Sequence, residues 1–158
     1  MFKVSVNAQL AKSYAPQLAQ QLRRAHRLIK PELTDLSIAL VGDEQMSALH
    51  NQYMGIDSPT DVLTFELDHG VRGNVTAGEV VVCVPEARRQ ATLRGTRAND
   101  EILLYALHGL LHLCGYDDKS APGFKRMHAM EDRILTKIGV GPVFAGDNRK
   151  SKRGRNTQ

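Results

Sequence analysis

The chain has 158 residues, of which 42% are hydrophobic, as expected for a soluble globular protein that forms its own core. Its net charge of +4 comes from the C-terminus, where five basic residues and no acid follow from Arg149 onward, so residues 1–148 carry a formal charge of −1. No stretch approaches 18 apolar residues and the first residues lack the apolar segment of a secretory signal, so we expect neither a membrane span nor secretion.

The first half of the chain alternates between predicted strands and helices. Apolar residues at every second position predict a strand over residues 2–6, which we expect at the edge of a sheet. Apolar residues at helical spacing predict a helix over residues 16–29. A second strand is predicted over residues 36–41, and Asp43 is expected to cap a helix that runs to Tyr53.

The second half continues with two strands and three helices. Runs of β-branched and aromatic residues predict strands over residues 61–65 and 79–84, joined by a loop over 68–77. The predicted helices of this half cover residues 85–93, a long apolar segment capped by Asn99 or Asp100, and residues 121–138.

Strands interleaved with helices predict an α+β fold with one domain over residues 1–145. We expect one mixed sheet of about four strands packed against about five helices, with the functional site on a central helix. Residues 146–158 have no apolar periodicity and are predicted to be a disordered basic tail. Each Lys or Arg of this tail would add a salt-sensitive increment to binding if the tail lies on the phosphates of a nucleic acid, and the alternative is a tail that only aids solubility.

Two histidines, His108 and His112, stand four residues apart in an otherwise apolar segment. On a helix both imidazoles would project from one face, about 6 Å apart along the axis, a distance that a single metal ion can bridge. One buried histidine is more often a hydrogen-bonded core residue, but two on one apolar face each need a polar partner. The pair therefore predicts a metal site. The other histidines lack ligand spacing and are expected at the surface, although the last of them deserves a check for proximity to the metal: His26, His50, His69 and His128.

Gly115 and Asp118 complete a set of three metal ligands. A continuing helix would turn Asp118 away from the histidines. Gly115 can adopt the left-handed conformation that ends helices, so a turn there can bring Asp118 back. Three protein ligands leave one position for water, as in catalytic zinc sites. We therefore predict that His108, His112 and Asp118 bind one zinc ion, with manganese or another divalent ion as the alternative.

The residue that follows the first histidine argues against a peptidase. Helical zinc proteases usually read His-Glu-x-x-His, with the Glu as general base, and here that position is Gly109. Glycine cannot exchange a proton with water, so peptide hydrolysis by that route is disfavoured. Gly109 also costs the helix up to about 1 kcal/mol relative to alanine. Three features can each account for a glycine at this position: space beside the metal, close approach of another backbone, or an ordinary helix packing contact.

Two stretches of the chain resemble the YbeY family of bacterial endoribonucleases. The segment His108-Gly-Leu-Leu-His112-Leu-Cys-Gly115-Tyr116-Asp117-Asp118 is similar to that family's His-Gly-x-Leu-His-Leu-x-Gly-Tyr-Asp-His. The segment Tyr53-Met-Gly-Ile-Asp57-Ser-Pro59-Thr60-Asp61-Val-Leu-Thr-Phe65 is similar to its Tyr-Arg-x-x-Asp-x-Pro-Thr-Asp-Val-Leu-Ser-Phe. The likeness covers roughly residues 1–140, nearly all of the predicted domain.

The chain departs from the family pattern at two positions. Asp118 stands where the family has a third histidine ligand, and an anionic ligand makes a bound metal a weaker Lewis acid. Met54 stands where the family has an arginine that would suit a phosphate. Another cation, such as Arg72 or Lys119, would have to replace it, or nuclease activity is weak or absent.

The resemblance implies a single-strand-specific metalloendoribonuclease that acts in 16S rRNA 3′-end maturation and ribosome quality control. Its implied partners are rRNA and the small ribosomal subunit, with no DNA and no membrane. The chain shows no secretory signal and has only two cysteines, and both features favour a cytoplasmic location. The oligomeric state stays open.

Asp117, beside the third ligand, is a candidate general base or a partner that orients a histidine, and the alternative is a turn residue that hydrogen-bonds its own backbone. Two other functions also stay open. One is a ribosome-associated RNA-binding factor with weak or no nuclease activity, which Met54 and Asp118 favour. The other is a different metallohydrolase, such as a peptidase.

Overall fold

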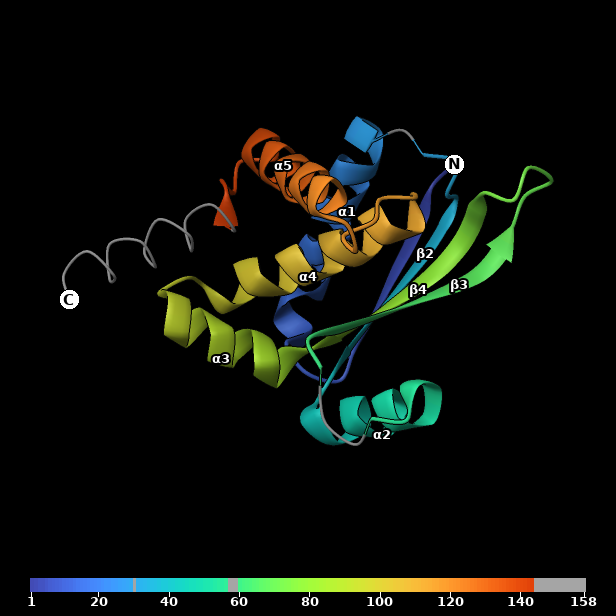
Figure 1. Cartoon of the computed structure of the whole chain (residues 1–158). Helices are drawn as coiled ribbons and strands as arrows, with labels where there is room; N and C mark the ends of the chain where they lie inside the picture. The colour runs from blue at the N-terminus through green and yellow to red at the C-terminus, as the bar shows by residue number, and fades with distance from the viewer. Residues whose placement is uncertain (30, 57–59, 144–158) are drawn as a thin grey trace.

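The computed structural model of the chain describes residues 1–29, 31–56 and 60–143 (Figure 1). This described part contains one four-stranded sheet in the order β1-β2-β4-β3. β1, β2 and β4 run parallel, and β3 pairs antiparallel with β4, so the sheet is mixed as predicted and β1 lies at an edge. The strands are β1 Lys3–Ala8, β2 Asp35–Val41, β3 Val62–His69 and β4 Val75–Cys83.

Helices cover both faces of the sheet. α1, α4 and α5 lie on one face, α2 lies on the other, and α3 packs against α4 (Figure 1). The predicted α+β class and single domain are therefore confirmed. Within the described ranges the helices are the 3-10 helix η1 Lys12–Tyr14 and the α-helices α1 Ala15–Ile29, α2 Asp43–Met54, α3 Val84–Arg94, α4 Ala98–Leu113 and α5 Ala121–Lys137.

Strand β4 is buried on both faces. Val80 and Val82 point into the main core, which also holds residues of α1, α4 and α5. Val81 and Cys83 join a second cluster with Met46 of α2. Because successive side chains of a strand point to opposite faces, the unbroken apolar run of β4 suits a strand between two layers of helices.

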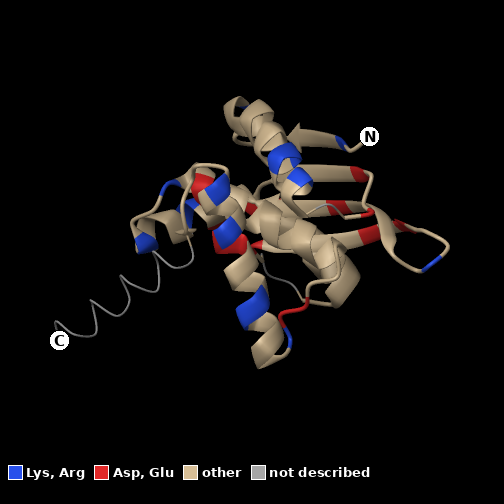
Figure 2. Cartoon of the chain, turned by 90° about the horizontal axis from the view of Figure 1, so that it is seen from above, with Lys and Arg blue, Asp and Glu red and all other residues tan. Residues whose placement is uncertain are grey.

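Helix α4 lies close against the sheet and is buried along most of its length. In Figure 2 charged residues lie mainly on the surrounding helices and strands, while α4 between them is tan along most of its length. A Cβ atom at Gly109 would lie 2.6 Å from Cγ1 of Val80, and a Cβ atom at Gly78 would lie 2.5 Å from Cδ1 of Leu113. Both glycines therefore set how near the helix comes to the sheet. Of the explanations considered for Gly109, the structure supports the close packing contact.

Asp43 does not cap α2, contrary to the prediction. It is the first residue of the helix, Gly42 occupies the N-cap position, and no side-chain capping bond forms there. The carboxylate of Asp43 pairs instead with Arg89 of α3 at 2.8 Å. The hydrogen bond from Arg89 lowers the pKa of Asp43 to about 2.

The start of α4 also differs from the prediction. The helix begins at Ala98 with Arg97 at the N-cap position, so neither Asn99 nor Asp100 is the cap. Asp100 still lies in the first turn, where a negative charge interacts favourably with the helix dipole.

The hairpin of β3 and β4 is longer than predicted. Pairing continues to His69 opposite Val75, so both strands extend into the segment expected to be a loop. The proposed domain boundary and the basic tail of residues 146–158 lie outside the described residues. No helix in the described part of the chain combines the length and apolarity needed to cross a membrane.

We expect Gly109→Ala to destabilise the protein by about 1–2 kcal/mol, because overpacking against Val80 outweighs the higher helix propensity of alanine. Urea unfolding of the variant and the parent chain measures this difference. Asn99→Ala, at an exposed position of the same helix, is the matched control and should leave stability almost unchanged. A Gly109→Ala protein as stable as the parent would contradict the packing contact.

Candidate metal centre

Helix α4 presents its two histidines to a cleft beside the sheet. Gly109 and Leu113 face the sheet, so His108 and His112, each one residue earlier, lie about 100° round the helix from them. The cleft has a volume of about 600 Å³ and lies between β3, α4 and the loop that leads to α5. Its polar lining residues are Asp61, Thr64, Glu66, His108, His112, Asp118 and Lys119.

The three predicted ligands lie together in this cleft. The Nε2 atoms of His108 and His112 are 3.1 Å apart. Oδ2 of Asp118 lies 3.3 Å from Nε2 of His108, and its Oδ1 lies 3.6 Å from Nε2 of His112. Donor atoms at about 2.0–2.1 Å from a tetrahedral zinc ion stand about 3.3 Å from one another. The donor set therefore fits one such ion and leaves a fourth position open.

The turn that returns Asp118 to the histidines is the one that Gly115 predicts. Gly115 has a φ of +99°, and a Cβ atom there would meet nothing within 4 Å, so conformation rather than space requires glycine. Its N–H donates to the carbonyl of His112 at 3.0 Å, and the N–H of Tyr116 donates to the carbonyl of Leu111 at 3.0 Å. These paired bonds are those of a Schellman motif, which ends a helix and reverses the chain.

Asp117 has a structural place in the loop between α4 and α5. Its Oδ1 accepts a hydrogen bond from the backbone N–H of Lys119 at 2.9 Å. Ser120 then caps α5, because its Oγ accepts from the N–H of Gly123 at 3.0 Å. Asp117 is absent from the residues that line the cleft in the described structure. The geometry therefore favours its turn role, and its role as a general base stays a prediction.

A buried carboxylate that the sequence did not predict lies behind His108. Glu131 of α5 is 1% exposed, and its Oε2 lies 3.5 Å from Nδ1 of His108. Its Oε1 lies 2.6 Å from Nδ1 of His128, which is 16% exposed rather than at the surface as expected. His50 is also buried, contrary to the prediction. The spacing of His128 and Glu131 on one helical face was visible in the sequence, but nothing there linked that face to α4.

His108 has acidic surroundings. Burial by itself lowers the pKa of His108, but the hydrogen bond and charge of Glu131, together with the charges of Asp118 and Asp61, raise it above its usual value overall. The negative potential that favours a proton on His108 also favours a divalent cation there, and the two compete as the pH falls.

The position at which the family resemblance implies an arginine lies in the cleft. Met54 lines it and is 63% exposed. Lys119 lines the same cleft, whereas Arg72 lies in the β3–β4 turn and is not among the described lining residues. Of the two cations considered as replacements, the structure therefore places Lys119 beside the ligand set.

Known proteins with similar sequences are endoribonucleases. The family model described as Endoribonuclease YbeY matches residues 3–139. Endoribonuclease YbeY of Geobacillus thermodenitrificans is 30% identical over 139 residues, which cover 77% of this chain and 89% of that protein. Endoribonuclease YbeY of Moorella thermoacetica is 36% identical over 115 residues, which cover 67% of this chain and 74% of that protein.

A solved structure is also similar. The solution structure of TM1509 from Thermotoga maritima aligns with a TM-score of 0.61 at 26% sequence identity and covers 90% of this chain and 95% of that protein. The fold and the extent of the family match agree with one another. The chain therefore belongs to the YbeY family of endoribonucleases.

Proposed function

We propose that the chain is a single-strand-specific, metal-dependent endoribonuclease that acts in 16S rRNA 3′-end maturation and ribosome quality control. The observation that carries the proposal is the triangle of His108, His112 and Asp118 inside an open cleft of a YbeY-family chain. RNA as the substrate follows from the names of the similar proteins. The proposed partners are rRNA and the small ribosomal subunit, and the proposed location is the cytoplasm.

His108, His112 and Asp118 would hold one zinc ion. When bound, the ion supplies a Lewis acid for a phosphate oxygen and makes a water molecule more acidic. Asp118 adds a hard, anionic oxygen donor where the family has an imidazole, which moves the preference of the site toward manganese relative to three histidines.

The other charged groups of the cleft orient the RNA. Lys119 offers an ammonium group that can pair with a phosphate beside the ligand set. Asp61 and Glu66 line the same cleft, and their negative charge disfavours a phosphate next to them. The scissile phosphate is therefore directed toward Lys119 and the metal position.

The purified chain with zinc or manganese should cleave single-stranded RNA, spare duplex RNA, and trim 3′-extended 16S rRNA in small ribosomal subunits. His112→Ala should lower the cleavage rate roughly 100-fold or more, because a ligand of the Lewis acid is lost. Asp118→His keeps three ligands and should stay active, whereas Asp118→Ala should not. Gel assays of labelled RNA and metal analysis, with one ion expected per chain, measure these outcomes.

Equal cleavage by His112→Ala would show that a contaminant is responsible. Binding of RNA without turnover in every metal tested would favour the second candidate, an RNA-binding factor without nuclease activity. The exposed Met54 in the cleft, where the family pattern has arginine, is the observation that keeps this candidate open.

Glu131 should strengthen metal binding because it holds Nδ1 of His108, leaving Nε2 to face the ion. We expect Glu131→Gln, which removes the charge, to lower metal affinity about 10-fold and Glu131→Ala to lower it by closer to 100-fold. Competition with a chromophoric chelator measures the affinity, and circular dichroism checks the fold.

A second buried glutamate supplies the matched control. Glu101 of α4 is fully buried and bonds Thr96 and Arg94 rather than a histidine. Glu101→Gln should change stability without changing metal affinity. Equal loss of affinity in both glutamine variants would show that Glu131 acts only through the stability of the fold.

The number of positively charged side chains in the cleft should influence the cleavage rate. We expect Met54→Arg to raise cleavage and Lys119→Met to lower it, each by about threefold to tenfold, since each changes one charged contact to phosphate. Arg72→Met, outside the cleft, should have no effect. Rates measured at two salt concentrations test the cause, because the Lys119→Met loss should shrink at high salt. A Lys119→Met protein with the parent rate would contradict this role.

A further inference from the structure

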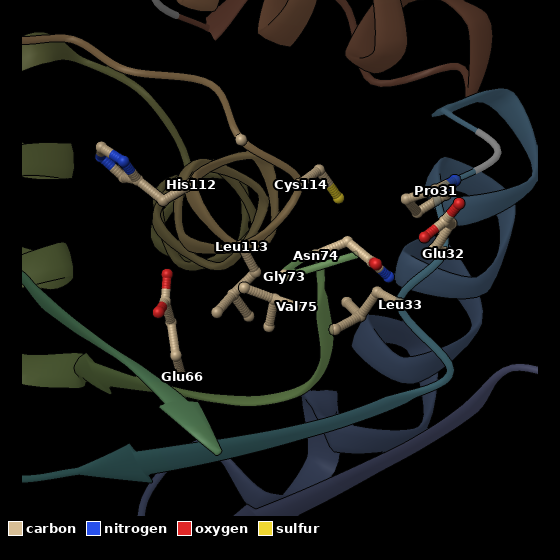
Figure 3. A pocket seen from close by; sticks show the side chains of 11 residues that line it. Pro31, Glu32, Leu33, Glu66, Gly73, Asn74, Val75, His112, Leu113 and Cys114 are labelled. Atoms are coloured by element: carbon tan, nitrogen blue, oxygen red, sulfur yellow. The ribbon is translucent and has the colours of Figure 1, made fainter. Parts of the chain in front are cut away.

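A second pocket, of about 400 Å³, opens next to the metal cleft (Figure 3). It lies at the C-terminal end of α4, between the segment that enters β2 and the β3–β4 hairpin. Glu66, His112 and Leu113 line both cavities. An RNA strand with a phosphate at the ligand set can therefore place its neighbouring unit in this second pocket.

The pocket combines apolar surface with the carboxylates of Glu32 and Glu66, which only accept hydrogen bonds, and with the side-chain amide of Asn74, which can also donate. Figure 3 shows Leu113, Val75 and Leu33 in the middle, with Glu66 on the side of His112 and Glu32 on the opposite side. Flat, partly apolar rings with polar edges suit such a lining, as do the unstacked bases by which proteins read single-stranded RNA. Its volume falls in the range of pockets that bind small ligands, about 300–1,000 Å³.

The charge of the pocket excludes phosphate. Glu32 and Glu66 contribute two carboxylates, and no Lys or Arg is among its described lining residues. The C-terminal end of α4 adds the negative end of a helix dipole. The part of an RNA strand that suits this environment is a base.

We propose that this pocket binds the base next to the scissile phosphate and prefers bases that carry an amino group. Carboxylates only accept hydrogen bonds, and the amino groups of cytosine, adenine and guanine donate them. Uracil instead presents two carbonyl oxygens beside its single N–H, and these would face Glu32 or Glu66. As a site for RNA the pocket rests on the proposed function, but its preference for an amino group can be measured without cleavage.

Cytidine and uridine form the matched probe pair, because they differ at the amino or carbonyl group on C4. In NMR titrations of the zinc-loaded full chain, cytidine should shift the amide signals of Leu33, Val75 and Cys114. It should bind about threefold to tenfold more tightly than uridine, the increment of one hydrogen bond to a charged acceptor at a partly exposed site. Glu32→Gln, whose amide can donate toward a carbonyl, should remove the difference, and Val75→Phe, which fills the pocket, should abolish binding of both nucleosides.

Glu44→Gln is the control, since Glu44 lies on α2 and lines neither cavity. Absent shifts at the pocket, equal binding of the two nucleosides, or a preference for cytidine that survives Glu32→Gln would each overturn the proposal. Cleavage of RNA by a chain that binds no nucleoside here would reject the base pocket alone. Preference for cytidine in a chain that cleaves no RNA would reject the proposed nuclease function alone.

Discussion

Helix α4 lies near enough to the sheet for Gly109 to contact Val80 and for Leu113 to sit over Gly78. A helix residue projects about 100° from its neighbour, so fixing Gly109 and Leu113 on the sheet also fixes where His108 and His112 point. Both imidazoles then face the cleft rather than the core. A glutamate at position 109, as in helical zinc proteases, would project into the sheet. The packing that directs the histidines into the cleft therefore leaves no space for the glutamate that helical zinc proteases carry at position 109.

Asp118, the third predicted ligand, is held by the loop on both sides of it. The Gly115 turn reverses the chain before Asp118, and the Asp117 side chain and the Ser120 cap fix the residues around and after it through backbone hydrogen bonds. Ordering a flexible loop costs about 1–2 kcal/mol per residue. Because local bonds already fix this loop, a metal ion would meet a site that needs little further ordering, which favours both affinity and definite geometry.

The grouping of His108, His112 and Asp118 and the turn at Gly115 could be predicted because each depends on spacing within a few residues of one helix. The mixed sheet was likewise visible as short apolar runs between helices. Glu131 could not be found, since it reaches His108 only through the packing of α5 against α4. The cap predicted at Asp43 was wrong for a related reason: its carboxylate pairs with Arg89, which lies 46 residues away in the chain. That partner is brought near by the packing of α2 against α3, which the residues around Asp43 do not encode.

Asp118, where the family resemblance implies a histidine, adds a carboxylate to an already acidic surrounding of His108. Asp118, Glu131 and Asp61 all act on His108, and without a cation they repel one another. A divalent ion would offset that repulsion while the fold keeps the carboxylates together, so its binding would stabilise the loop and the junction of α4 with α5 as well as supply chemistry. The same acidity extends through Glu66 into the second pocket, where it opposes phosphate and leaves room for a base. The negative charge of these carboxylates would make a bound metal ion a weaker Lewis acid. The same charge would help to direct a phosphate to the metal position and the neighbouring base to the second pocket.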